Sequence, residues 1–114
     1  MKYISTRGNY EEVKSAEAIQ LGMVPTGGLF VPQKVPQLEQ DEIFAWQDKS
    51  YQEIAQKVLS KFLTDYSQEE LEELVNAAYN GENFAESEIA PLVNLEDEQY
   101  ILELWHGPTA AFKD

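Results

Sequence analysis

Two neighbouring segments with apolar residues at helical spacing constrain the fold more than any other feature of the chain. In residues 51–63 and again in 67–80, apolar side chains recur at intervals of three and four residues, so that they share one face of a helix. A Ser-x-x-Glu capping box opens the second segment at Ser67, and Asn80-Gly81 is a typical helix end. Because the link between the segments is only a few residues long, the two helices are expected to form a hairpin. The expected buried positions are Tyr51, Ile54, Ala55, Val58, Leu59, Phe62 and Leu63 in the first helix and Leu71, Leu74, Val75 and Ala78 in the second.

The residues before this hairpin predict short strands and turns around one short helix. Residues 3–6 and 29–31 have the composition of strands, the second of which should stop at Pro32. Ser15 is the expected N-cap of a helix that ends before Gly22. The remaining expectations are a turn at Pro25-Thr26-Gly27-Gly28 and a leading helical turn at 41–46.

Gly27-Gly28 allows two interpretations. Two adjacent glycines can form a phosphate cradle, or they can serve a tight turn before a strand. The sequence favours the turn because neither a G-x-x-x-x-G-K-[ST] nor a G-x-G-x-x-G pattern surrounds them.

Beyond the hairpin, the chain predicts a polar loop and then two short strands. Residues 82–90 are polar, 92–95 and 100–104 are strand-like, and the acidic run 96–99 lies between them. Short strands followed by helices and further strands indicate an α+β fold.

Composition excludes several classes of function. The 114 residues contain no cysteine, which rules out disulfides, thiol catalysis and cysteine metal sites and fits a cytoplasmic protein. No apolar run is long enough to span a membrane. The net charge of −13 opposes binding to nucleic acid or to an anionic membrane surface. The glutamates at 69, 70, 72 and 73 point to several sides of a helix, so no metal site is expected.

The last dozen residues carry the clearest chemical signal. A β-type run enters a turn at Gly107-Pro108, Thr109 can cap a new helix, and Lys113 falls in its first turn. A partly desolvated lysine near the positive end of a helix has its ammonium form disfavoured. This is the condition under which a lysine amine reacts with a carbonyl group, so Lys113 is the candidate catalytic residue.

The string His106-Gly107-Pro108-Thr109-Ala110-Ala111-Phe112-Lys113-Asp114 resembles the lysine motif of the threonine synthase family. Two earlier blocks, Tyr3–Gly8 and Pro25–Pro32, resemble the amino-terminal domain of the same family, whereas Trp105 stands where that family commonly has phenylalanine. The resemblance spans essentially the whole chain. It implies the amino-terminal portion of such an enzyme, ending just after the cofactor lysine.

The resemblance implies a fold and its division. Residues 1–95 would form a small α+β amino-terminal domain with short strands and a helical hairpin. Residues 96–114 would supply the first strand and turn of a truncated fold-type II catalytic domain that depends on pyridoxal phosphate.

The resemblance also implies a reaction. The family converts O-phospho-L-homoserine and water to L-threonine and phosphate. Lys113 would bind pyridoxal phosphate covalently and act as base and acid, and His106 and Thr109 are candidate cofactor contacts. For His106 the alternative is a structural hydrogen bond, and for Thr109 a helix cap. The family's phosphate-binding glycine loop lies further along than Asp114, so the 114 residues alone are expected to be inactive and not to bind the cofactor stably.

Two further interpretations remain open. The chain could be a free-standing acidic interaction module whose end only resembles the motif, or part of a related phospho-lyase that makes another product. In each enzyme interpretation the partner is a small-molecule substrate. The strand at 100–104 is also expected to expose an apolar edge, which favours self-association.

Overall fold

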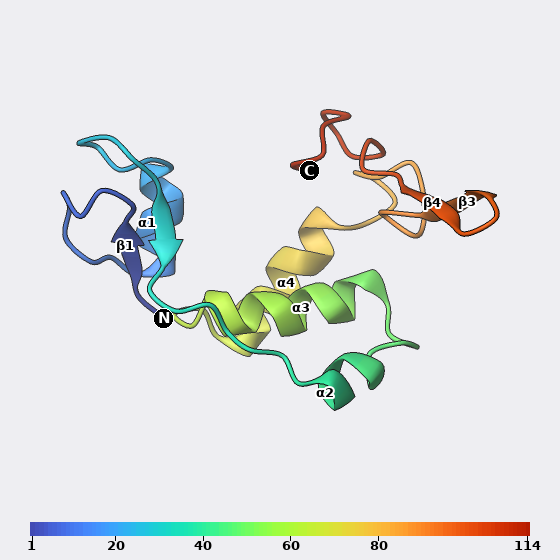
Figure 1. The fold of residues 1–114 in the computed structure, drawn as a ribbon, viewed down its shortest axis with the longest axis horizontal. Coiled ribbons are helices and arrows are strands. Elements are labelled where there is room, and N and C mark those ends of the chain that lie inside the picture. The colour runs from blue at the N-terminus through green and yellow to red at the C-terminus, as the bar shows by residue number, and fades with distance from the viewer. The chain divides into compact units, whose positions relative to one another are not determined.

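The computed structural model describes residues 1–114 and divides them into two compact units, Met1–Glu72 and Glu73–Asp114. Figure 1 follows the chain from β1 in blue to β4 in orange. The elements confirm the α+β class, and no helix is both long and apolar enough to cross a membrane. In chain order they are β1 (Tyr3–Ser5), α1 (Ser15–Leu21), β2 (Phe30–Pro32), α2 (Gln40–Phe44), α3 (Tyr51–Phe62), α4 (Gln68–Ala78), β3 (Leu92–Glu96) and β4 (Gln99–Leu102).

The first unit opens with a two-stranded antiparallel ribbon. In β1 and β2, Tyr3 lies opposite Pro32 and Ser5 lies opposite Phe30. Tyr3 also forms an isolated antiparallel bridge with Val13. The strands predicted at 3–6 and 29–31 are confirmed, except that Pro32 is the last residue of β2 and does not lie beyond it. Proline is tolerated there because a strand end at a sheet edge need not donate its N–H to a neighbour.

The amino terminus of α1 differs from the prediction. Lys14 occupies the N-cap position and makes no side-chain capping bond, whereas Ser15 is already the first helical residue. The cap comes instead from Asp65, whose carboxylate accepts hydrogen bonds from Ser15 and from the backbone N–H of Ala16. The helix ends as predicted at Gly22, which has φ of 70°.

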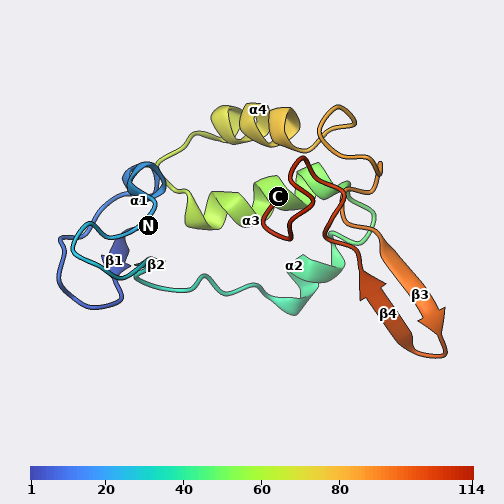
Figure 2. The same ribbon diagram turned by 90° about the horizontal axis from the view of Figure 1, so that it is seen from above.

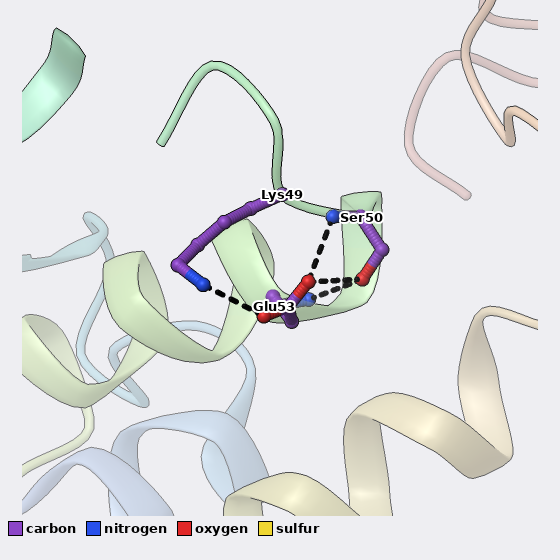
Figure 3. Close-up of polar contacts among 3 residues, drawn as sticks. All are labelled: Lys49, Ser50 and Glu53. Carbon is purple, nitrogen blue, oxygen red and sulfur yellow. Dashed lines mark hydrogen bonds and ion pairs between the residues drawn. The ribbon is translucent and has the colours of Figure 1, made fainter. Parts of the chain in front are cut away.

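Both long helices begin with a capping box. In α4, the Ser67 hydroxyl accepts from Glu70 N–H at 3.1 Å, and the Glu70 carboxylate accepts from Ser67 N–H at 2.7 Å, as predicted. In α3, Ser50 and Glu53 form the same reciprocal pair, which the Ser-x-x-Glu spacing could also have revealed. The Lys49 ammonium forms an ion pair with the Glu53 carboxylate, with Nζ 2.8 Å from Oε1 (Figure 3).

The predicted apolar stripes are buried less completely than expected. In α4, Leu71 is only 3% exposed and Val75 only 2%, but Leu74 is 53% exposed and Ala78 is also exposed. No residue of α3 is buried. Tyr51 is exposed, and the other residues of the apolar stripe of α3 are half-buried. Periodicity identifies the apolar face of a helix, but it does not show whether another element covers that face. The buried apolar residues are Val13, Ala18, Val24, Trp46 and Leu71 in the first unit and Val75, Phe84 and Ile89 in the second.

The second unit contains an irregular segment and a β-hairpin. Residues 82–90 have no helix or strand, as predicted, yet Phe84 in this segment is buried and its ring centroid lies 5.6 Å from that of Tyr79. β3 and β4 pair antiparallel, with Val93 opposite Ile101, and appear as two adjacent arrows in Figure 2. Every residue of both strands is exposed.

Candidate functional site

The segment that carries the lysine motif leaves β4 and is anchored to the rest of its unit. Glu103 N–H donates to the carbonyl of Pro91 at 2.9 Å, which continues the hairpin pairing beyond Leu102. Ala85 N–H donates to the carbonyl of His106 at 3.1 Å. These two bonds attach the start of the motif to the irregular segment and to the hairpin of the same unit.

His106 makes a close side-chain contact within the motif. Its Nε2 lies 2.6 Å from Oε2 of Glu103, three residues earlier, and both side chains are partly buried. Its ring also lies against that of Trp105, with centroids 5.6 Å apart. A structural hydrogen bond is therefore present, and a cofactor contact by His106 stays a prediction.

The helix predicted after Thr109 is not formed. Two successive turns take its place, closed by Ala110 N–H to the Gly107 carbonyl at 3.1 Å and by Asp114 N–H to the Ala111 carbonyl at 3.0 Å. Ala110 has φ of 53°, which interrupts a right-handed helix. Forming a first helical turn fixes the backbone of several residues for a single hydrogen bond. This loss of conformational entropy disfavours a helix in a short segment.

Asp114 holds these turns together. Its carboxylate accepts from Thr109 Oγ1 at 2.6 Å and from Thr109 N–H at 2.8 Å, and more weakly from Ala111 N–H at 3.4 Å. The Thr109 hydroxyl is thus a donor here and does not cap a helix. The hydrogen bond from the Thr109 hydroxyl lowers the pKa of the Asp114 carboxyl below its ordinary value; desolvation opposes this shift, and the N–H groups of Thr109 and Ala111 add to it.

Gly107 permits the close approach of Asp114. A Cβ atom added to Gly107 would lie 2.5 Å from Cβ of Asp114 and 2.7 Å from its Oδ2. Any larger residue would therefore displace the carboxylate that closes the turns. This contact gives a physical reason for glycine at this position of the motif.

Lys113 lies on this turn with its side chain exposed. It takes part in no ion pair, and its Nζ lies 6.0 Å from the ring centroid of the adjacent Phe112. The expected position in a first helical turn is wrong, and the exposed ammonium is not desolvated by the described residues. The amine is accessible to a carbonyl compound.

The structure offers little that would hold the rest of pyridoxal phosphate. A shallow hollow of about 230 Å³ lies in the second unit, below the size usual for small-molecule sites. Its lining includes the Asp114 carboxylate and contains no lysine or arginine. These residues therefore fit the covalent attachment of the cofactor at Lys113 but not the binding of its phosphate. The lining residues are Ala78, Tyr79, Asn83, Phe84, Pro108 and Asp114.

Comparisons with known proteins agree with the motif. The family model described as the threonine synthase N terminus matches residues 2–79. Threonine synthase of Schizosaccharomyces pombe is 42% identical over 116 residues, which are 100% of this chain and 22% of that protein. Threonine synthase-like 2 of Xenopus laevis is 34% identical over 116 residues, covering 100% of the chain and 24% of that protein.

A solved structure of threonine synthase has the same fold over this part of its chain. The crystal structure of threonine synthase from Brucella melitensis with bound pyridoxal phosphate superimposes with a TM-score of 0.89 at 38% identity, over 99% of this chain and 24% of that one. The chain thus spans about a quarter of the length of the proteins that it matches. The chain belongs to the threonine synthase family and corresponds to its amino-terminal part.

Proposed function

We propose that this chain is the amino-terminal part of a threonine synthase that, when intact, converts O-phospho-L-homoserine and water to L-threonine and phosphate. The observation that carries the proposal is the motif from His106 to Asp114, which presents an accessible Lys113 amine on a turn held by Asp114. The family match over 2–79 supports it, because an unrelated acidic module would have no reason to match there.

Pyridoxal phosphate, when bound, supplies an electron sink for charge that develops on the substrate carbon skeleton. In this proposal Lys113 would hold the cofactor through Nζ, and the same amine would take up and return protons at the substrate. His106 and Thr109 would border the cofactor. The turn held by Thr109 and Asp114 sets the direction in which the Lys113 side chain leaves the backbone.

The 114 residues alone are proposed to be inactive. Lys113 is exposed, and the hollow of its unit presents a carboxylate where a phosphate would need a cation. Added pyridoxal phosphate should therefore give only weak visible absorbance, shared with the other lysines. Stoichiometric absorbance that disappears in Lys113→Ala would contradict this part of the proposal.

A chimaeric enzyme tests the proposed activity. The 114 residues would replace the matching segment of Schizosaccharomyces pombe threonine synthase, to which they align over their full length. The chimaera should release phosphate from O-phosphohomoserine, and Lys113→Ala should abolish both this release and the absorbance of bound cofactor. Lys34→Ala, at an exposed lysine outside the motif, is the matched control and should retain both. Turnover retained in the Lys113→Ala chimaera would exclude the assigned role.

A second candidate is a related phospho-lyase with a different product. The observation in its favour is the similarity to threonine synthase-like 2 of Xenopus laevis at 34% identity. Product analysis of the natural full-length enzyme by mass spectrometry separates the two, because only the first candidate forms threonine together with phosphate.

A further inference from the structure

The two glycines at 27 and 28 belong to an exposed platform in the first unit. Residues 5–9 and 26–29 lie side by side and are joined by several hydrogen bonds. Thr6 N–H donates to the Leu29 carbonyl at 2.9 Å, and Leu29 N–H donates to the Thr6 hydroxyl at 3.0 Å. The Thr26 hydroxyl donates to the Asn9 carbonyl at 3.1 Å. Both segments are therefore fixed relative to each other.

Asn9 completes this platform with its side chain. Its Oδ1 accepts from the hydroxyl of Ser5, a buried residue, at 2.6 Å. Its Nδ2 consequently points the other way and donates to the carbonyls of Thr26 and Gly27 at 3.0 and 3.2 Å. Because both ends of the amide are satisfied, the glycine loop is held in a single position.

The loop lies directly against the side chain of Arg7. A Cβ atom at Gly27 would be 3.0 Å from Nη1 of Arg7, and one at Gly28 would be 3.2 Å from Cγ of Arg7 and 3.0 Å from Oγ1 of Thr6. The two glycines also have φ of 93° and 105°, in the region that other residues rarely adopt. The positive φ values require glycine at both positions, and the Arg7 side chain lies against the loop.

The Arg7 guanidinium has no partner within the chain. Arg7 is exposed and takes no part in the ion pairs of the structure, although the sequence has 21 acidic residues against 8 basic ones. The backbone N–H of Gly28, beside the arginine, also donates no hydrogen bond. An unpaired guanidinium beside a loop with a free backbone N–H presents several hydrogen-bond donors to a ligand.

We propose that Arg7 and the Gly27-Gly28 loop form a binding site for an oxyanion, either a phosphate group or a carboxylate. The planar guanidinium can donate two parallel hydrogen bonds to either group, and the free Gly28 N–H belongs to the loop against which the Arg7 side chain lies. The site uses no residue of the lysine motif, so it stands apart from the function proposed above. Phosphate and carboxylate share this chemistry, and the experiment separates them.

Nuclear magnetic resonance titration of the 114-residue chain tests the site. Inorganic phosphate and acetate are added in separate series at constant pH, with sodium chloride keeping ionic strength constant. The expected result is a saturable shift of the Gly27 and Gly28 amide signals and of the Arg7 Nε–H signal. Saturation with phosphate alone identifies a phosphate site, saturation with acetate alone a carboxylate site, and saturation with both a general oxyanion site. The absence of a saturable shift in both series would overturn the proposal.

Variants separate a specific site from general attraction to positive charge. Arg7→Gln should weaken binding at least tenfold, and Arg7→Lys should weaken it as well, because an ammonium cannot form the two-pronged contact. Lys34→Gln removes the same charge from another exposed position and should leave the shifts unchanged. The Arg7 side chain makes no hydrogen bond within the chain, so these variants should keep the dispersed spectrum of the folded protein. Equal losses in Arg7→Gln and Lys34→Gln would contradict the assignment.

Discussion

Asp65 caps a helix that begins 50 residues before it. Its Oδ1 accepts from the hydroxyl and the backbone N–H of Ser15, and its Oδ2 accepts from Ala16 N–H at 3.0 Å. Ser15 is fully buried, so its hydroxyl has no access to water as an alternative partner. The link between α3 and α4 is thereby joined to the first turn of α1, where a carboxylate also complements the helix dipole.

Replacing Asp65 should destabilise the chain. Asp65→Ala removes the cap and leaves the Ser15 hydroxyl unsatisfied, which should lower the free energy of unfolding by about 2–3 kcal/mol in a urea titration. The amides of α1 should exchange faster with solvent. Asp48→Ala, at an exposed carboxylate without a hydrogen-bond partner, should change stability by less than about 0.5 kcal/mol. Similar values for the two variants would exclude the cap.

The contribution of Asp65 should depend on pH. Burial opposes its ionisation, but the hydrogen bonds from Ser15 and from Ala16 N–H outweigh burial and lower the pKa of the carboxyl below its ordinary value. A lowered pKa in the folded state adds stability above the unfolded-state value of about 3.9 and loses it as pH falls through the folded-state value. The stability difference between wild type and Asp65→Asn should thus be largest above pH 5 and shrink below pH 4. A constant difference over this range would contradict the mechanism.

Glu53 should titrate far below an ordinary glutamate. The Lys49 ammonium, helped by the backbone and hydroxyl of Ser50, lowers the pKa of Glu53 from 4.5 to about 2 (Figure 3). Lys49→Ala should raise this pKa towards its ordinary value in a carbon-13 titration of the carboxyl group. Lys61→Ala, which removes a lysine paired with Glu42 instead, should leave it unchanged. An unchanged pKa in Lys49→Ala would show that the ion pair does not form in solution.

Two leucines of α4 provide a matched test of the core. Leu71 is 3% exposed and Leu74 is 53% exposed. Leu71→Ala should cost about 2–4 kcal/mol through lost burial and the cavity left behind, whereas Leu74→Ala should cost about 0.5 kcal/mol or less. Denaturant titrations of both variants measure the difference. A larger cost at Leu74 would mean that the buried part of the apolar face is centred on Leu74 and not on Leu71.

The β3–β4 hairpin should cause self-association of the 114-residue chain. It exposes large apolar side chains, among them Tyr100 and Leu102, and each strand has one unpaired edge. Sedimentation velocity should show dimers that increase with concentration, and Leu102→Lys should weaken dimerisation by at least about tenfold, or 1.4 kcal/mol. Met23→Lys introduces the same charge at an exposed residue of the other unit and should have little effect. A monomer at every concentration would contradict this prediction.

Local sequence determined the elements. Apolar periodicity placed α3 and α4, the Ser67 capping box placed the start of α4, and two strand-like runs on either side of an acidic run placed the β3–β4 hairpin. Such features depend on residues within a few positions of one another, and these interactions are visible in the sequence. The motif from His106 to Asp114 likewise indicated the family without any structure.

The tertiary structure decided which contacts these elements make and which of their residues are buried. Asp65 caps α1 in place of Ser15 because the folded chain brings the α3–α4 link to that helix, and no local pattern encodes a contact across 50 residues. Leu71 is buried and Leu74 exposed for a similar reason, since coverage depends on what packs against α4. Lys113 lies on a turn instead of a helix, in a segment where Ala110 has φ of 53°, the Asp114 carboxylate accepts from Thr109 N–H, and Gly107 leaves room for that carboxylate. Local propensity specifies what a segment can form, and long-range contacts select the arrangement that satisfies its polar groups and buries its apolar ones.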